Sequence, residues 1–119
     1  MTGMDDASLD PLDALTTAPD FHRVLLENDA VRVLDTVVRP GDTVPLHTHR
    51  WPAVLYVLSW SDFVRRDADG LIMMDSRGYP QLKPGTAVWC GPLPPHTLEN
   101  VGEDDLRIIA VEQKHAAAH

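Results

Sequence analysis

The sequence predicts an all-β fold, either a sandwich or a small closed barrel. After Pro19, about nine short runs of β-branched and apolar residues follow one another, at 24–27, 30–38, 43–49, 53–60, 62–66, 71–75, 86–90, 96–101 and 106–112. Turn-forming pairs separate the runs, and Asp69-Gly70 is typical of a two-residue hairpin. No stretch of 12 residues in this region keeps a helical period without Gly or Pro. Short, evenly spaced strands indicate an antiparallel architecture rather than alternating strands and helices.

The length of 119 residues predicts a single domain with a hydrophobic core of its own. We expect residues 1–20 to form an N-terminal arm that is partly disordered or holds a short helix. Asp10 and Pro11 would open this helix and Pro19 would stop it. Residues 21–114 would form the β domain, and residues 115–119 a C-terminal tail.

The charge balance argues against polyanionic and membrane partners. Ten basic residues stand against 18 acidic ones, a formal charge of -8, and the densest basic run, Arg65-Arg66, is followed at once by Asp67. Binding to nucleic acid needs a cationic face, so neither nucleic acid nor a membrane is expected as a partner. The single cysteine, Cys90, excludes an internal disulfide. The longest apolar run, 53–58, is too short to span a bilayer. A cytoplasmic location is therefore expected.

Three histidines follow two similar segments. His47 and His49 stand two residues apart on a predicted strand, so their side chains leave the same face. A Pro-Gly turn at Pro40 and a short strand precede them, and the same order, beginning at Pro84, precedes His96. An isolated His-x-His is weak evidence for a metal site, but two such segments could bring three imidazoles to one point inside a barrel.

These segments resemble the two sequence motifs of the cupin superfamily over residues 21–114, and the chain looks like a small single-domain bacterial cupin. The matching positions are Gly41, His47 and His49 in the first motif, and Gly85, His96 and Asn100 in the second. The resemblance implies a double-stranded β-helix, a homodimer, and one divalent metal ion per chain bound by His47, His49 and His96.

The chain departs from the first motif where the family has a glutamate. That position holds Ala53, or Val54 in an alternative register, and no acid lies between Asp42 and Asp62. Three neutral imidazoles would leave a divalent ion with its full charge and with open positions. A small chelating organic anion, such as an enolate, catecholate or thiolate, could then complete the site as substrate or ligand.

The resemblance to three-histidine cupin oxygenases implies a metal-dependent dioxygenase that uses Fe²⁺. Imidazole donors also suit Zn²⁺, Ni²⁺ and Cu²⁺. Two alternatives stay open. One is a non-catalytic cupin that binds or senses a small molecule. The other is a Zn²⁺-dependent hydrolase or isomerase, for which no general base is evident near the motifs.

Four further residues are candidates for the substrate pocket. Trp51 and Trp89 could form an apolar wall, although core or dimer packing is the favoured role of Trp89. Tyr56 is expected in the core and becomes a candidate acid only if its ring faces the metal. Arg65 and Arg66 alternate on a strand, so one should point inward, and Arg65 is the candidate carboxylate anchor.

The remaining chemistry-bearing residues are expected to be structural or without a role. Cys90 is expected to be a small buried residue. Asn100 should hydrogen-bond to the backbone at a turn. His22 lies far from the motifs in the sequence, and it is given no role, like His115 and His119.

Overall fold

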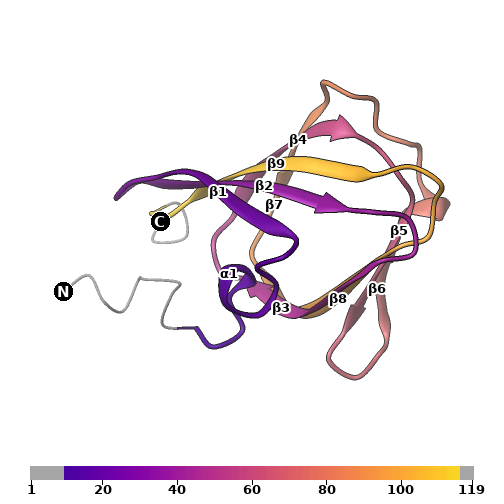
Figure 1. The fold of residues 1–119 in the computed structure, drawn as a ribbon, viewed down its shortest axis with the longest axis horizontal. Helices are drawn as coiled ribbons and strands as arrows, with labels where there is room; N and C mark the ends of the chain where they lie inside the picture. Colours follow the sequence, from indigo (N-terminus) through magenta and orange to yellow (C-terminus); the bar gives the residue numbers. More distant parts are fainter. Residues whose placement is uncertain (1–9, 116–119) are drawn as a thin grey trace.

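A computed structural model describes residues 10–115 and shows two antiparallel sheets that face each other around a central space (Figure 1). The first sheet has the order β1 (His22–Glu27), β2 (Val31–Val38), β9 (Leu106–Gln113), β4 (Ala53–Ser59) and β7 (Ala87–Cys90). The second has the order β3 (Thr43–His49), β8 (Leu93–Asn100), β5 (Phe63–Asp67) and β6 (Ile72–Asp75). Each predicted run corresponds to one strand, which confirms the all-β barrel. A short 3₁₀ turn, η3 (Ser76–Gly78), follows β6.

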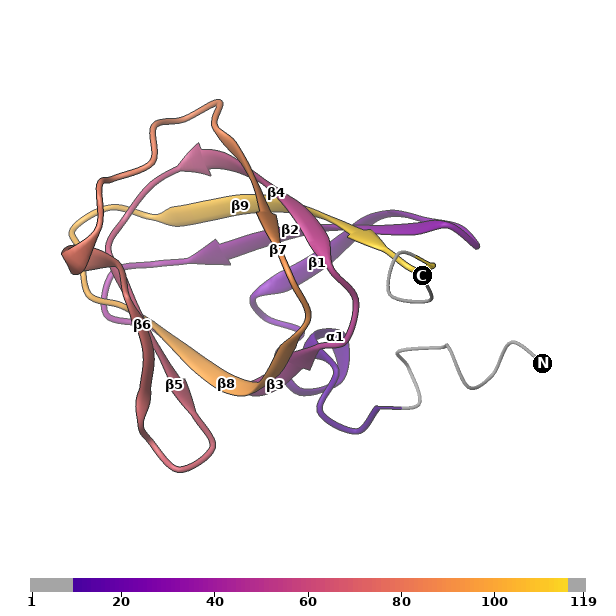
Figure 2. The same cartoon turned by 180° about the vertical axis from the view of Figure 1, so that it is seen from behind.

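The predicted Asp69-Gly70 turn closes the β5–β6 hairpin, which projects from one side of the barrel (Figure 2). Gly70 has a φ of +84°, a left-handed conformation that costs glycine little. Its amide donates to the carbonyl oxygen of Asp67 at 3.0 Å. The turn chemistry read from the sequence therefore sets this connection.

Residue alternation decides what lies inside the barrel. β2 and β9 pair residue by residue without interruption, from Val31 opposite Gln113 to Val38 opposite Leu106. Leu34 and Val38 of β2, and Leu106 and Ala110 of β9, are buried in the core. The same inward phase continues to Arg32 on β2 and to Glu112 on β9, which are also buried. One end of the apolar interior thus carries ionisable side chains.

The described part of the predicted arm packs against the barrel. Asp13, not Asp10, caps a helix of four residues, α1 (Ala14–Thr17), so the helix starts later than predicted. Ala14 and Ala18 are buried, and the carbonyl oxygen of Leu12 accepts a hydrogen bond from the amide of Thr48 on β3. Residues 1–9 of the predicted arm and residues 116–119 of the predicted tail lie outside the described residues. Within that range, no helix has the length and apolarity needed to cross a membrane.

Asn100 organises the corner that joins β8 to β9, as the sequence predicted. Its amide nitrogen donates to the carbonyl oxygens of Val38 and Asp104, each at 2.8 Å. Its side-chain oxygen accepts from the hydroxyl of Ser61 and from the amide of Gly102. The backbone of the corner is therefore held by one buried side chain.

This corner leaves no room for a side chain at position 102. A Cβ on Gly102 would lie 2.8 Å from the amide nitrogen of Asp62 and would also overlap the Ser61 hydroxyl. We expect Gly102→Ala to lower the free energy of unfolding by about 1–3 kcal/mol, as overpacking does. Gly78→Ala is the matched control, since a Cβ there has no atom within 4 Å. Equal urea midpoints for the two variants would contradict the described corner.

Candidate metal centre

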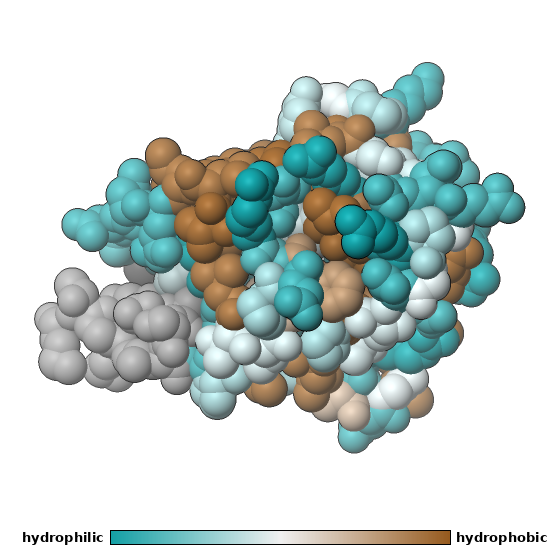
Figure 3. Space-filling model, viewed as in Figure 1, coloured by the Kyte–Doolittle hydropathy of each residue, from teal (hydrophilic) through white to brown (hydrophobic). Residues whose placement is uncertain are grey.

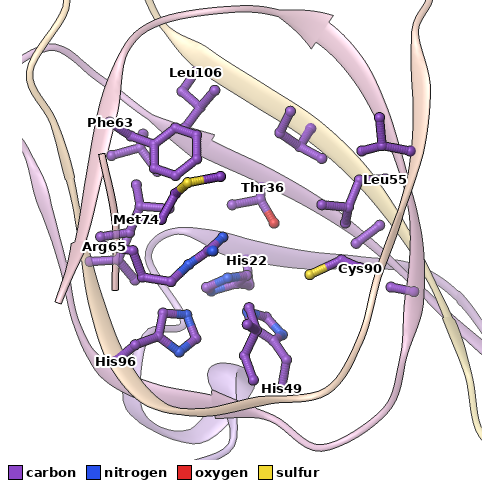
Figure 4. A pocket seen from close by; sticks show the side chains of 18 of the residues that line it. His22, Thr36, His49, Leu55, Phe63, Arg65, Met74, Cys90, His96 and Leu106 are labelled. Atoms are coloured by element: carbon purple, nitrogen blue, oxygen red, sulfur yellow. The ribbon is translucent and has the colours of Figure 1, made fainter. Parts of the chain in front are cut away.

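Four histidines from three strands converge at one end of the barrel interior, and Figure 4 labels three of them, His22, His49 and His96. They are His22 of β1, His47 and His49 of β3, and His96 of β8. His47 and His96 are paired across β3 and β8, and their ring centroids lie 4.3 Å apart. The rings of His47 and His49 lie 4.9 Å apart, and those of His49 and His96 5.6 Å apart. The three histidines predicted from the motifs are thus brought together.

His22 is the residue that the sequence interpretation missed. Its potential ligand atom lies within 4.8 Å of those of His47 and His49, and the three form the one group of at least three candidate metal ligands this tight among residues 10–115. The structure thus makes His22 a candidate ligand, although its place in the sequence gave it no role. β1 pairs with β2 so that His22 stands opposite Thr36, which lines the interior cavity. Sequence distance from the motifs gave no information about this pairing.

In all four rings the Nδ1 atom has an acceptor. The carbonyl oxygens of Ala18, Pro45 and Pro94 lie 3.0, 2.7 and 2.8 Å from the Nδ1 atoms of His22, His47 and His96. For His49 the acceptor is Glu112, with Oε2 at 3.3 Å. Because a carbonyl oxygen can only accept, Nδ1 carries the proton in the first three rings. Nε2 is then the nitrogen with a free lone pair, the arrangement that metal-binding histidines adopt.

The closest contact in the cluster joins two such lone pairs. Nε2 of His47 and Nε2 of His49 lie 3.1 Å apart. When both rings are neutral with Nδ1 protonated, neither Nε2 can donate, and a cation shared between the two lone pairs makes this contact favourable. The donor set therefore fits a divalent metal ion, and nitrogen donors of this kind suit Fe, Ni, Cu and Zn.

Burial keeps three of the histidines neutral. It lowers the pKa of His22 and of His96 to about 4, from an ordinary value of 6.5. The pKa of His47 falls to about 2, chiefly through burial and also through the neighbouring His49 and His96. These rings can therefore bind a metal at neutral pH without first losing a proton.

A carboxylate does lie beside the cluster, contrary to what the gap in the first motif suggested. Glu112 of β9 is directly opposite Ala53 of β4 and directly opposite Arg32 of β2. The position without the motif glutamate thus faces a glutamate on the neighbouring strand. Burial opposes the ionisation of Glu112, but hydrogen bonds from His49 and Arg32 outweigh it and lower the pKa. Inward alternation along 106–112 is the sequence signal that could have identified Glu112.

An apolar cavity of about 280 Å³ extends from the histidines into the barrel. Arg65 lines it and points toward the cluster, between His96 and Met74 (Figure 4). Its Nε is buried without a hydrogen-bond partner, its guanidinium lies 5.4 Å from the ring centroid of Phe63, and burial lowers its pKa. No carboxylate among residues 10–115 forms an ion pair with it.

The two predicted pocket tryptophans and Cys90 all line the cavity, but they differ in how buried they are. Trp51 is buried and lines the cavity, and the cationic groups of Arg32 and Lys114 lie 5.1 and 5.4 Å from its ring centroid. Trp89 contributes to the lining although it is 60% exposed. Cys90 is part of the cavity wall and only half-buried, which corrects its expected core position.

Tyr56 is neither in the core nor in the cavity wall, which corrects its prediction. It is 42% exposed, and its hydroxyl lies near Gly85. Ala53, Leu55 and Val57 of β4 line the cavity, so Tyr56 points to the opposite face. Since Ala53 marks the inward phase of the strand, this alternation could have excluded Tyr56 from the sequence alone.

We expect the metal-free protein to lose stability as the pH falls below about 6.5. His22, His47 and His96 take up protons near 6.5 when the chain unfolds, but only near 4 or below when it is folded. Acid therefore favours the unfolded state, by about 2 kcal/mol per histidine at pH 5. Urea unfolding after chelation should show this loss, and His22→Asn should reduce it whereas His115→Asn should not. Equal stability of the metal-free protein at pH 7.5 and pH 5 would contradict buried, neutral rings.

Comparison with known proteins supports the fold. No family model and no curated protein sequence matches the chain. Among solved structures, a cupin domain from Bordetella pertussis has a TM-score of 0.62 at 17% identity, covering 77% of this chain and 90% of its own. An RmlC-like cupin with a double-stranded β-helix fold, from Methanocaldococcus jannaschii, has a TM-score of 0.57 at 16% identity, with 82% of each chain covered. The polyketide cyclase RemF from Streptomyces resistomycificus has a TM-score of 0.52 at 22% identity, covering 78% of this chain and 63% of its own. The chain therefore has the cupin fold, a double-stranded β-helix.

Proposed function

We propose that this protein is a metal-dependent enzyme that acts on a small chelating organic anion, with dioxygenase chemistry as the leading reaction. One observation carries the proposal. The histidine cluster and the unpaired guanidinium of Arg65 face the same apolar cavity. A metal ion at the histidines and Arg65 across from it would bind a ligand that is anionic at its ends and apolar in its body.

The size and lining of the cavity support a small substrate. A volume of about 280 Å³ is at the lower end of the range for ligand pockets. Leu55, Val57 and Ile108 supply apolar walls that exclude water from the bound anion. In such surroundings the attraction between Arg65 and a carboxylate or enolate is stronger than in water.

The charge balance also supports an anionic ligand. The histidines contribute no charge when they bind a metal, and the carboxylate of Glu112 is already hydrogen-bonded to Arg32 and His49. A divalent ion would therefore keep most of its charge until a ligand arrives. Bound Fe²⁺ would supply the reactivity with O₂, while Arg65 and the apolar walls would orient the anion. Fe²⁺ is favoured, and the same donors suit Zn²⁺, Ni²⁺ and Cu²⁺.

Two other functions make different predictions. A Zn²⁺-dependent hydrolase or isomerase needs a general base, and Glu112 is a weak one because its hydrogen bonds lower the pKa. The structures of similar fold include a polyketide cyclase, which supports non-redox chemistry as an alternative. A non-catalytic binding or sensor cupin would use the same cavity without turnover.

The homodimer stays a prediction. Apolar side chains gather on the face over β1 and β2 (Figure 3), and Val24, Leu25 and Leu26 of β1 are 40–52% exposed. This exposed apolar surface supports a homodimer as the proposed assembly.

Oxygen consumption separates these functions. Protein loaded anaerobically with Fe²⁺ or with Zn²⁺ would be mixed with a β-diketone, a catechol or a thiol acid. We expect O₂ uptake in step with loss of one of these anions in the Fe²⁺ form only. Binding of the anions without loss of any of them would indicate a binding protein, and turnover in the Zn²⁺ form without O₂ would indicate non-redox chemistry.

Arg65 and its neighbour provide a charge-matched test of the anion site. We expect Arg65→Met to weaken binding of the chelating anion by about 10–100-fold, since a hydrogen bond to a charged group contributes about 1.5–3 kcal/mol. Arg66→Met removes the same charge from a residue that pairs with Glu99 at 3.1 Å and does not line the cavity. Calorimetric titration of the metal-loaded proteins measures both. Equal losses of anion affinity in the two variants would mean that Arg65 acts only through the net charge of the protein.

A further inference from the structure

We infer that the metal is held by four imidazoles, with His22 as the fourth protein ligand in a chain that lacks the motif glutamate. The inference rests on the proposed metal-dependent function and assigns a role to a residue outside both motifs. It also gives Glu112 a positioning role, in which its carboxylate orients His49 through a hydrogen bond and does not itself bind the ion.

His22 meets the requirements of a ligand. It is buried, and its ring centroid lies 5.2 Å from that of His47 and 5.5 Å from that of His49. Its Nδ1 donates to the carbonyl oxygen of Ala18, which fixes the tautomer and turns Nε2 into the acceptor. Within residues 10–115 no hydrogen bond is made by that Nε2. The lone pair of that Nε2 is therefore available to a metal ion.

His96 remains part of the set although it lies outside the tightest group. It is 1% exposed, its Nδ1 donates to the carbonyl oxygen of Pro94, and its ring is the nearest of all to His47. His47 and His96 have the same local design, with each Nδ1 bonded to the carbonyl oxygen of a proline two residues earlier. The two strands therefore present matched rings to one point.

The spacing of the nitrogens indicates how many positions stay open. For metal–nitrogen bonds of about 2.1 Å, ligands at 90° place their nitrogens about 3.0 Å apart, and ligands at the tetrahedral angle about 3.4 Å apart. The separation of 3.1 Å between Nε2 of His47 and Nε2 of His49 is closer to the first value. The nitrogen of His96 lies outside the group whose ligand atoms are within 4.8 Å of one another, so its ring must move closer for all four to bind one ion. Four imidazoles on a six-coordinate ion would then leave two positions, which is the number that a bidentate anion needs.

Glu112 supplies charge to this site from one bond further out. Its Oε2 accepts from Nδ1 of His49, and Oε1 accepts from Nε of Arg32. A carboxylate on Nδ1 makes the imidazole a better donor without occupying a position on the metal. Glu112 thus polarises His49 without competing with an anionic substrate for a position on the metal.

The test counts imidazoles by X-ray absorption at the zinc edge, on Zn²⁺-loaded protein. His22→Asn keeps a donor for the carbonyl oxygen of Ala18 and removes Nε2, so the fold should persist, and His22→Ala provides a second variant. His115→Asn is the control because that residue is exposed. We expect four imidazoles in the wild type and the control, and three in the His22 variants. Zn²⁺ affinity in the His22 variants should fall at least about tenfold.

The outcomes distinguish the inference from the function on which it rests. A wild type that binds no metal would overturn the proposed function itself. A wild type with three imidazoles, unchanged in His22→Asn at unchanged affinity, would overturn the role of His22 and leave the metal-dependent function intact. A Glu112 oxygen bonded to zinc in the wild type would overturn the positioning role of Glu112.

Discussion

A buried guanidinium connects the fold to the metal centre. Both side-chain oxygens of Asp13 accept hydrogen bonds from Arg32 at 3.0 Å, and Glu112 accepts a third from it. These contacts join the cap of α1, the inner face of β2 and the inner face of β9. Burial alone would lower the pKa of Arg32, but the two carboxylates raise it above its ordinary value. Removing the guanidinium would leave two buried charges without a counter-ion, which costs about 3–5 kcal/mol when one partner of a buried pair is lost.

The same contacts orient the ligand that has no carbonyl acceptor. His22, His47 and His96 are fixed through the backbone near them, whereas His49 depends on Glu112. Glu112 in turn depends on Arg32 for its position. The Arg32–Glu112 pair, which joins β2 to β9, therefore holds the ring of one candidate metal ligand, and we expect stability and metal binding to be coupled through it.

The distribution of charge around the cavity determines which ligands the cavity favours. Neutral imidazoles lie at one end, an unpaired arginine points in from the wall, and apolar side chains fill most of the remainder. The nearby carboxylate of Glu112 is already hydrogen-bonded to Arg32 and His49. This distribution attracts an anion and keeps water away from it, which suits a substrate that chelates a metal.

Much of the fold and half of the site could be predicted from local sequence. β-branched runs and turn residues located the nine strands, because both signals depend only on neighbours in the chain. The spacing of His47 and His49 placed two imidazoles on one face for the same reason. His22 could not be located in this way, since its place depends on the register of β1 with β2, and the pairing of Glu112 with Ala53 depends on the register of β9 with β4. Alternation within a strand was available, and it would have corrected Tyr56 and directed attention to Glu112.

The most direct test of this metal centre is anomalous diffraction at the zinc edge from crystals grown with Zn²⁺. We expect one strong peak per chain, within bonding distance of the Nε2 atoms of the four histidines and with the carboxylate of Glu112 beyond bonding distance. A cavity without a peak, or a peak bonded to Nδ1 atoms or to Glu112, would contradict a four-imidazole centre supported by Arg32 and Glu112.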